Sequence, residues 1–350
     1  MILPLLAGVA FLVAGAELLV RGASRLALAL RIPPLIVGLT VVAFGTSSPE
    51  LAVSIEAALA GHADIAIGNV VGSNIFNVLL ILGAAALVAP LRVSSQLVRL
   101  DVPVMIVVSV MLLSMAWDGR IGRLDGVLLL VALLAYLAYL FRAGRKAAAE
   151  TEPDPGRQGR GAIAFALDGG FIVAGLILLV LGSDWLVEGS RLIATRMGVS
   201  ELLIGLTVVA AGTSLPELAT SVVAAVRGER DIAVGNVVGS NIFNILAILG
   251  IAATVAPAGL VASAAAATFD IPVMTAVAVV CLPVFVGGTI ERWEGGLFVA
   301  YYIAYAVYLA LDATDHGALP QFRNAMIYFV IPLTVLTLAV MMLRSWKARP

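Results

Sequence analysis

Two glutamates lie deep inside apolar segments, in nearly identical surroundings. Glu50 follows Gly-Thr-Ser-Ser-Pro at residues 45–49, and Glu217 follows Gly-Thr-Ser-Leu-Pro at residues 212–216. A charged side chain near the centre of a membrane costs about 2.5–3.5 kcal/mol or more. Snorkelling or protonation explains a lone glutamate equally well, but two matched carboxylates brought together repel unless a cation or protons lie between them. The pair therefore favours a cation site.

A proline precedes each glutamate and predicts a break in the helix that carries it. Pro49 has no N–H, so the carbonyl of Gly45 loses its helical partner, and Pro216 has the same effect on Gly212. Irregular backbone is tolerated at membrane depth only where it is buried in protein or lines a polar cavity. We expect carbonyl oxygens to turn inward at both breaks, namely those of Ala43, Gly45 and Thr46 in the first and those around Ala210 and Thr213 in the second.

Amide and hydroxyl side chains follow each break at helical spacing. They recur at i, i+4 and i+8 on one helix face, as Asn69, Ser73 and Asn77 and again as Asn236, Ser240 and Asn244. Such residues also join helices through hydrogen bonds, which is the role we expect of Asn69 and Asn236 and leave open for Asn74 and Asn241. The candidate ligands are those deeper in the spans: Ser73, Asn77, Ser240 and Asn244.

The combined ligand set contains only oxygen: two carboxylates, backbone carbonyls, asparagine amides and the hydroxyls near the breaks. Hard cations match this set, and Ca²⁺ accepts six to eight oxygens at adjustable geometry. Two carboxylates offset one divalent ion, whereas monovalent ions would need two or more. A Cys/His metal site is excluded, because the chain has a single cysteine, Cys281, and two histidines in expected loops, His62 and His316.

These residues belong to a segment that occurs twice. Residues 38–83 and 205–250 align without a gap at an offset of 167 and agree at 34 of 46 positions. Weaker matches extend the repeat, such as Asp101-Val-Pro-Val-Met105 with Asp270-Ile-Pro-Val-Met274. The glycine pairs 68 and 72, and 235 and 239, form G-x-x-x-G surfaces that permit close helix approach. Two copies of one polar cluster predict two halves of one site.

The elements that carry the repeat are predicted membrane spans. The chain is 61% hydrophobic and 12% charged, with a mean hydropathy of +1.08, and apolar runs long enough to cross a bilayer recur along it. The first run is expected to be a retained span rather than a removed signal peptide. The eleven candidate spans are 2–20, 33–60, 65–89, 101–117, 124–141, 167–187, 201–226, 232–256, 270–288, 295–311 and 325–343.

The predicted fold is an all-α polytopic membrane protein with two inverted-topology repeats of five transmembrane helices and one extra C-terminal helix. An odd number of spans in each unit makes the second copy enter the membrane upside down. The expected units are a first repeat (1–143), a flexible cytoplasmic linker (144–166), a second repeat (167–312) and the extra C-terminal helix (313–350).

Basic residues predict the orientation of this arrangement in the cell (inner) membrane. With the N-terminus outside, 16 arginines and lysines fall inside and 5 outside, as the positive-inside rule requires. The linker and the C-terminus are then cytoplasmic. The net charge of −1 gives no attraction to nucleic acid, and the oligomeric state stays open.

Other acidic residues have simpler explanations. Asp64, Asp231, Asp101 and Asp270 precede apolar runs and are expected to cap helices, while Asp125 and Glu294 are expected in first helical turns. Glu17 and Asp184 are paired by the repeat and either are span-end charges or line an ion entrance. Glu56 is not expected in the site, because Val223 takes its place in the second copy.

The doubled motifs G-T-S-x-P-E and G-N-V-V-G-S-N-I-F-N resemble the alpha repeats of the calcium/cation antiporter superfamily, and most of all those of the prokaryotic sodium/calcium exchangers. The resemblance extends from residue 1 to about residue 311. It implies ten helices in two inverted halves, with spans 2, 3, 7 and 8 around the ions and spans 1 and 6 sliding across them. The extra span 11 departs from that pattern.

The resemblance also implies a role for each matching residue. The calcium ligands would be the side chains of Glu50 and Glu217 with the carbonyls of Thr46 and Thr213. The sodium ligands would be the carbonyls of Ala43 and Ala210 with Ser47, Ser214, Ser73 and Ser240. Asn77 and Asn244 would point at the middle of the cluster. Sodium flowing down its gradient would then drive calcium out, with more than one sodium per calcium and a net movement of charge.

Several functional readings compete with sodium/calcium exchange. A proton/calcium exchanger could cycle protons on the same two glutamates, although protons need no cage of hydroxyls. Some relatives carry Asp where this chain has Asn244, so we expect no potassium dependence. A cation channel would need a continuous wet path, and an intramembrane hydrolase would need a nucleophile or zinc arrangement that the spans lack. We therefore expect a transporter of Na⁺ and Ca²⁺ in the lipid bilayer, not an enzyme, with no cofactor.

Overall fold

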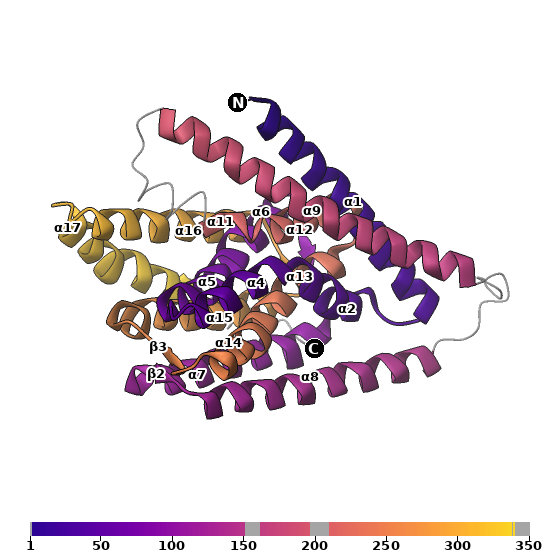
Figure 1. Cartoon of the computed structure of the whole chain (residues 1–350), viewed down its shortest axis with the longest axis horizontal. Helices are drawn as coiled ribbons and strands as arrows, with labels where there is room; N and C mark the ends of the chain where they lie inside the picture. The colour runs from indigo at the N-terminus through magenta and orange to yellow at the C-terminus, as the bar shows by residue number, and fades with distance from the viewer. Residues whose placement is uncertain (1, 151–161, 197–209, 338, 340–350) are drawn as a thin grey trace.

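Helices dominate the computed structural model of the chain, which describes residues 2–150, 162–196, 210–337 and 339 (Figure 1). Eight helices in this part of the chain are long and apolar enough to cross a membrane, and there are nine if the bent pair Pro34–Thr46 and Ser48–Leu59 is one span. The chain is therefore a helical, multi-pass membrane protein, as predicted. Span 201–226 is described only from Ala210 onward.

The first half begins with the long helix α1 and ends with the long helix α8. Between them the chain is repeatedly interrupted by short π-helical turns, which are labelled η. Its helical elements are α1 (Ile2–Leu30), α2 (Pro34–Val37), η1 (Gly38–Val42), α3 (Ala43–Thr46), α4 (Ser48–Leu59), α5 (Ala63–Phe76), η2 (Asn77–Leu82), α6 (Gly83–Val88), η3 (Leu97–Asp101), α7 (Val102–Met115), the 3₁₀ turn η4 (Ala116–Asp118) and α8 (Arg123–Glu150).

The second half repeats this order in the residues that are described. Its elements are α9 (Ala162–Arg196), α11 (Ala210–Gly212), α12 (Leu215–Arg227), α13 (Arg230–Phe243), η7 (Asn244–Leu249), α14 (Gly250–Val255), η8 (Ala266–Asp270), α15 (Ile271–Phe285) and α16 (Arg292–Ala313).

Two helical columns form the centre of the bundle. They are residues 63–88 (α5, η2 and α6) and residues 230–255 (α13, η7 and α14). In the apolar stretches of these two spans 78% and 89% of the residues are buried, against no more than 44% in the other six spans. Gly235 and Gly239 let α13 approach the η1 region closely, since a Cβ on Gly239 would lie 2.7 Å from the Leu39 carbonyl oxygen. The equivalent partners of Gly68 and Gly72 lie in 202–210, mostly outside the described residues.

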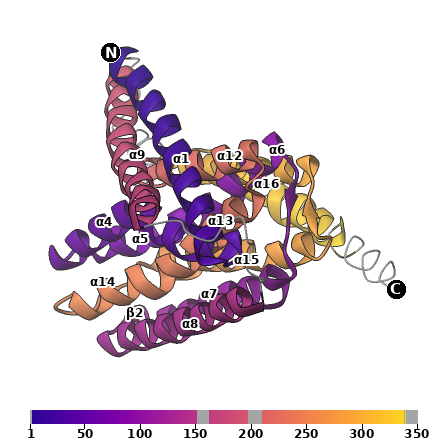
Figure 2. The ribbon, with the colours of Figure 1, turned by 90° about the vertical axis from the view of Figure 1, so that its right-hand side faces the viewer.

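Helices α1 and α9 pack antiparallel along a ladder of glycines. Glycines of α1 lie against the backbone of α9 at three levels: Gly8 near Gly182, Gly15 near Gly175 and Gly22 near Asp168. A Cβ atom on Gly15 would lie 2.8 Å from the Gly175 carbonyl oxygen, so the two backbones touch. Figure 2 shows this pair projecting from the rest of the bundle. Because α1 opens one half and α9 opens the other, their opposite directions mean that the halves are inverted relative to each other.

Two short antiparallel strand pairs join the halves in a way the sequence did not predict. Strand β1 (Leu91–Arg92) pairs with β4 (Thr289–Ile290), and β2 (Arg120–Ile121) pairs with β3 (Leu260–Val261). Each pair takes one strand from each half, and the two pairs occupy equivalent positions in the repeat. The two strand pairs therefore connect the first half to the second half at two places.

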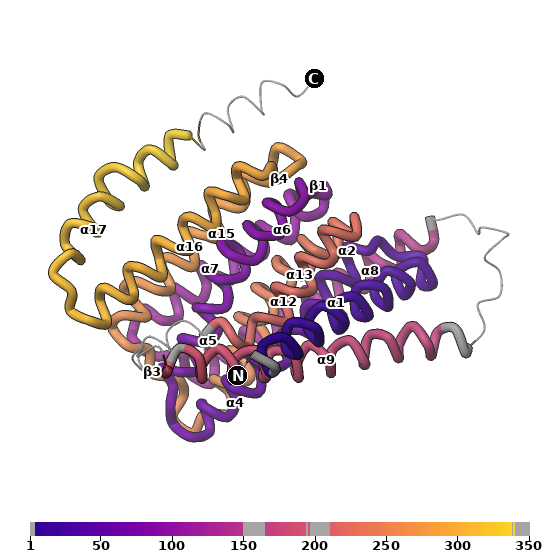
Figure 3. The backbone as a smooth tube through the Cα atoms, turned by 90° about the horizontal axis from the view of Figure 1, so that it is seen from above, coloured from indigo at the N-terminus to yellow at the C-terminus, as the bar shows by residue number. Residues whose placement is uncertain are grey.

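The extra C-terminal segment is helical and lies at the edge of the molecule. Helix α17 (Leu319–Ala325), the π turn η9 (Met326–Val330) and the helix that continues to residue 337 run back beside α16 (Figure 3). The Tyr301 hydroxyl contacts the Thr334 hydroxyl there. The segment starts before the predicted residue 325, and most of its predicted end, from 338 to 343, lies outside the described residues.

The helices on both sides of the predicted linker are longer than expected. Helix α8 continues through residues 144–150, and α9 starts at Ala162, so only 151–161 of the predicted 144–166 segment falls outside the described residues. The sequence Arg-Lys-Ala-Ala-Ala-Glu at 145–150 explains the first extension, because these residue types have high helix propensity.

Candidate cation site

Both predicted helix breaks are present, and they have matching geometry. The first lies at Ser47, where the flanking helices are bent by 47°. Ser47 has φ −81° and ψ 9°, in the bridge region that is sparsely populated by ordinary residues. Ser214 has φ −92° and ψ 6° between α11 and α12. The Gly-Thr-Ser-x-Pro-Glu sequence therefore gives the same local structure twice.

Each glutamate occupies the first turn of the helix that restarts after the break. Glu50 lies in the first turn of α4 and Glu217 in that of α12, and each is 1% exposed. The N-terminus of a helix carries a partial positive charge that favours a nearby carboxylate. The restarted helices thus offset part of the free-energy cost of burying the two acids.

A serine from the opposite half holds each carboxylate. The Ser47 hydroxyl donates to Glu217 Oε1 at 2.8 Å, and the Ser214 hydroxyl donates to Glu50 Oε1 at 2.8 Å. Ser214 Oγ also lies 3.2 Å from Ser73 Oγ. Neither carboxylate is complete without the other half, so the two breaks form one cluster at the join.

The second oxygen of each carboxylate has no hydrogen-bond partner although it is buried. Eight side-chain N or O atoms in the described residues are buried in this way, and six of them belong to residues predicted as ligands. These six are Glu50 Oε2, Glu217 Oε2, Asn77 Oδ1, Asn244 Oδ1, Ser240 Oγ and Thr213 Oγ1. A buried oxygen without a partner costs about 1–3 kcal/mol. A bound cation would satisfy several such oxygens at once.

The composition of the cluster fits a hard cation. No group of three or more His, Cys, Asp or Glu side chains gathers in the part of the chain that the structure describes. The donors are two carboxylates with neutral amides and hydroxyls, which match Na⁺ or Ca²⁺ rather than a soft transition metal.

The carbonyl of Ala43 differs from the prediction. It accepts the Ser47 N–H at 3.0 Å, because α3 closes its last turn on Ser47, so the break does not free it. The Thr46 hydroxyl also lies 3.4 Å from this carbonyl oxygen, so an ion bound there would share the oxygen with both groups. In the other half the Ser214 N–H bonds the Ala211 carbonyl at 3.2 Å instead. Ala210 begins α11, and its side chain is outside the described set.

Asn77 and Asn244 each begin a π-helical turn. The turns span Asn77–Leu82 and Asn244–Leu249, and both interrupt the central helices directly after the G-S-N-I-F sequence. π turns inside α-helices recur at functional sites because the extra residue re-aims the side chains around it. Both asparagines are 1% exposed.

Asn69 and Asn236 join helices, as expected. Asn69 Nδ2 donates to the Glu50 carbonyl at 3.1 Å, and Asn236 Nδ2 donates to the Glu217 carbonyl at 3.4 Å. Each amide therefore fixes the backbone of a site glutamate to the next helix. The Thr46 hydroxyl lies 3.1 Å from Asn236 Oδ1, which ties the first break to α13 of the other half.

Asp101 and Asp270 are not helix caps, which corrects the sequence-based prediction. Both have helical dihedral angles because η3 and η8 already extend the helix before them. Asp101 is fully buried and accepts hydrogen bonds from the Tyr136 hydroxyl at 3.0 Å and from Gln96 Nε2 at 3.2 Å. Asp270 accepts from the Tyr305 hydroxyl at 3.0 Å. The offset of 169 that relates Asp101 to Asp270 also relates the tyrosines and could have revealed both pairs.

The other acids expected as caps also sit differently. Asp64 and Asp231 are first-turn residues of α5 and α13, which begin two residues earlier than expected. Asp125 and Glu294 lie in first turns, as predicted.

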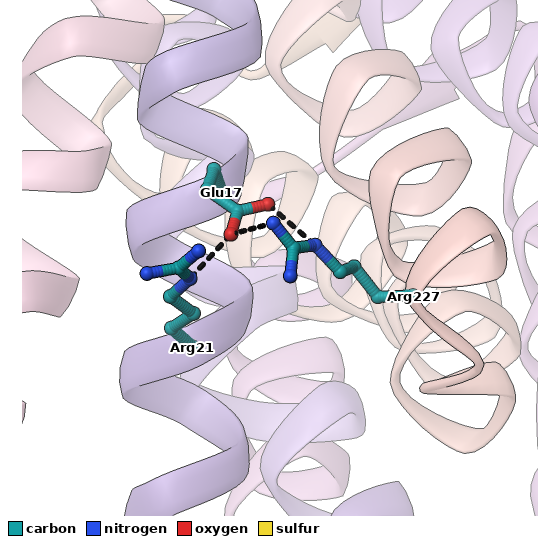
Figure 4. Close-up of polar contacts among 3 residues, drawn as sticks. All are labelled: Glu17, Arg21 and Arg227. Atoms are coloured by element: carbon teal, nitrogen blue, oxygen red, sulfur yellow. Dashed lines mark hydrogen bonds and ion pairs between the residues drawn. The ribbon is translucent and has the colours of Figure 1, made fainter.

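Glu17 belongs to an ion-pair cluster rather than to the carboxylate pair at the break. Its carboxylate contacts Arg21 one turn along α1 and Arg227 at the end of α12 (Figure 4). Asp184, its counterpart in the repeat, is exposed on α9. The residues equivalent to Arg21 and Arg227 are Glu188 and Ala60, so the same cluster cannot form in the other half.

The chain matches known proteins over nearly its whole length. A family model described as sodium/calcium exchanger protein matches residues 1–142 and 169–311. The inner membrane protein YrbG of Escherichia coli (strain K12) is 42% identical over 259 residues, covering 72% of this chain and 79% of YrbG. The sodium/calcium exchanger MaX1 of Methanosarcina acetivorans is 35% identical over 342 residues, covering 87% of this chain and 97% of MaX1.

Solved structures of a sodium-calcium exchanger, NCX_Mj, have a similar fold. The form soaked with zero Na⁺ and Ca²⁺ superposes with a TM-score of 0.76 at 30% sequence identity, covering 88% of this chain and 98% of that one. The form soaked with 10 mM Na⁺ and zero Ca²⁺ gives 0.75 at 31% identity, with coverage of 87% and 97%.

Proposed function

This chain belongs to the sodium/calcium exchanger family, and we propose that it exchanges Na⁺ for Ca²⁺ by alternating access at the carboxylate pair. The observation that carries the proposal is the crossed Ser47–Glu217 and Ser214–Glu50 hydrogen bonds, with one unpartnered oxygen left on each carboxylate. The geometry presents two carboxyl groups and several neutral oxygens at the join of the halves.

Charge explains why one site can serve both ions. A single Ca²⁺ offsets Glu50 and Glu217, while Na⁺ would have to bind in more than one copy to do the same. The Thr46 and Thr213 carbonyls would complete the calcium site. Sodium would use the Ala43 and Ala210 carbonyls with the serine hydroxyls: Ser47, Ser73, Ser214 and Ser240. A hydroxyl has one hydrogen and two lone pairs, so Ser47 can donate to Glu217 and bind Na⁺ together.

Three finer properties belong to the same proposal. Exchange is electrogenic, because the sodium ions moved carry more charge than the calcium ion. It is independent of K⁺, because neutral amides occupy both middle positions, Asn77 and Asn244. In the cell (inner) membrane the N-terminus lies outside, and the linker and the C-terminus lie in the cytoplasm, following the distribution of basic residues.

Transport by the purified chain in liposomes tests the coupling ion. Ca²⁺ uptake is measured with an outward Na⁺ gradient, a pH gradient or a K⁺ gradient imposed one at a time. We expect uptake with the Na⁺ gradient alone, and acceleration by an inside-positive potential. Uptake driven by the pH gradient in the absence of Na⁺ would instead identify a proton/calcium exchanger. A requirement for external K⁺ would contradict the proposed independence.

A further inference from the structure

Four asparagines form a hydrogen-bonded network where the two central helices meet. Asn74 Nδ2 donates to the Asn241 carbonyl at 3.2 Å, and Asn241 Nδ2 donates to the Asn74 carbonyl at 3.3 Å. All four side chains, including those of Asn77 and Asn244, are at most 2% exposed. The network is nearly symmetric, since each contact has a counterpart in the other half.

The side-chain oxygens of this network accept from the proposed ligands. Asn77 Nδ2 donates to Asn241 Oδ1 at 3.0 Å, and Asn244 Nδ2 donates to Asn74 Oδ1 at 3.0 Å. Each ligand asparagine therefore donates a hydrogen bond to the side-chain oxygen of an asparagine of the opposite half.

An asparagine amide has two chemically opposite ends, and only its oxygen can bind a cation. With Nδ2 of Asn77 and Asn244 engaged across the join, their Oδ1 atoms are left buried and without a partner. If either amide turned over, its oxygen would face the oxygen of Asn241 or Asn74, while its NH₂ would take the place of the unpartnered oxygen. The network excludes that arrangement.

Asn74 and Asn241, which accept these hydrogen bonds, cannot themselves turn over. Asn74 Nδ2 is fixed by the Asn241 carbonyl and lies 3.5 Å from Met274 Sδ, and Asn241 Nδ2 lies 3.6 Å from Met105 Sδ. A turned amide would bring its oxygen against a carbonyl oxygen. The backbone therefore sets the orientation of Asn74 and Asn241, and these set the orientation of the ligands.

We propose that Asn74 and Asn241 are positioning residues that hold the Asn244 and Asn77 amides with oxygen toward the ion. Asn241 acts on Asn77, and Asn74 acts on Asn244. The inference rests on the proposed function, because it assumes that the two ligand oxygens bind the transported cation.

A double-mutant cycle with Ca²⁺ alone as the probe tests the pairing. Ca²⁺ binding to the purified full-length chain in detergent is measured for Asn241→Leu, Asn77→Ser and their combination. Leucine has a similar size but offers no acceptor, and a serine hydroxyl has no end that must be oriented. We expect Asn241→Leu to weaken binding about tenfold in the wild-type background, the equivalent of one hydrogen bond to a functional group. In the Asn77→Ser background, Asn241→Leu should weaken Ca²⁺ binding little further.

The repeat supplies the matched control. Asn241→Leu combined with Asn244→Ser should weaken Ca²⁺ binding by the product of the two single effects. The reason is that Asn74 keeps its hydrogen bond to the Asn241 main chain and still accepts the hydrogen bond of residue 244 when that residue is Asn. Equal coupling of Asn241 to both ligands, or no coupling to Asn77, would overturn the inference and assign Asn241 to packing alone. A wild-type chain that binds no Ca²⁺ would instead remove the proposed function on which the pairing rests.

Discussion

Ser214 and Glu50 come from opposite halves of the chain, and the Ser214 hydroxyl donates to Glu50 Oε1 at 2.8 Å. The reciprocal bond from Ser47 to Glu217 has the same length. Each half thus supplies a carboxylate that is oriented only when the other half is in place. A relative movement that separated the halves would release both carboxylates together.

Removal of either carboxylate should abolish exchange. We expect Glu50→Gln or Glu217→Gln to reduce Na⁺-dependent Ca²⁺ flux in liposomes by about a hundredfold or more, because one remaining charge cannot offset a divalent ion. Glutamine keeps the size of the side chain, so the elution profile of the purified protein should not change. Normal transport by both variants would refute the central role of the pair.

Loss of the crossed hydrogen bonds should weaken ion binding without abolishing it. Ser214→Ala removes a hydrogen bond to a charged group, worth about 1.5–3 kcal/mol, so the Ca²⁺ concentration for half-maximal flux should rise about tenfold or more. Ser48→Ala is the matched control, since Ser48 is exposed and its hydroxyl donates to the Phe44 carbonyl of the same half, not to a carboxylate. The idea fails if the two variants show the same change.

The buried tyrosine–aspartate pair should matter for stability more than its counterpart. Tyr136→Phe takes one donor from Asp101, which is fully buried, and should lower the free energy of unfolding by about 1–3 kcal/mol. Tyr305→Phe should have a smaller effect because Asp270 is only partly buried. Thermal unfolding in detergent compares the two, and equal shifts would show that burial is not the cause.

The glycine ladder between α1 and α9 should tolerate no side chain. An added methyl group at Gly15 would meet the Gly175 carbonyl oxygen at 2.8 Å and the Leu179 nitrogen at 2.8 Å, so Gly15→Ala should destabilise the protein by about 1–3 kcal/mol. At Gly170, on α9 itself, nothing lies within 4 Å of the added atom. Gly170→Ala should therefore leave the melting temperature unchanged or slightly higher. A Gly15→Ala protein as stable as wild type would mean that the two helices can move apart.

The sequence was most informative where a residue type has one local consequence. Pro49 and Pro216 predict helix breaks because proline lacks an N–H, and both breaks are present. The doubled glutamates pointed to a shared cluster because the repeat related them. The prediction that the break frees the Ala43 carbonyl was wrong, since the sequence does not show where the last turn before a break will close.

Contacts between the halves could not be read from the sequence. The repeat aligns Ser47 with Ser214, but only the fold shows that each serine crosses to the other half's glutamate. Asp101 resembled a helix cap because it precedes an apolar run, whereas here a π turn, Leu97–Asp101, carries the helix through it. The Asn74–Asn241 contact likewise needs the crossing of two helices that are 167 residues apart.

The unpartnered oxygens of Glu50 and Glu217 also bear on leakage. With 1% exposure each, the two carboxylates have almost no water to screen them when the site is closed on both sides. Closure around an empty site would confine two like charges in a medium of low dielectric constant, which is strongly unfavourable. While both carboxylates are ionised, only a site loaded with cations could then pass from one face of the membrane to the other. An exchanger that works in this way would not return empty, so the downhill ion could not dissipate its gradient without moving the other ion.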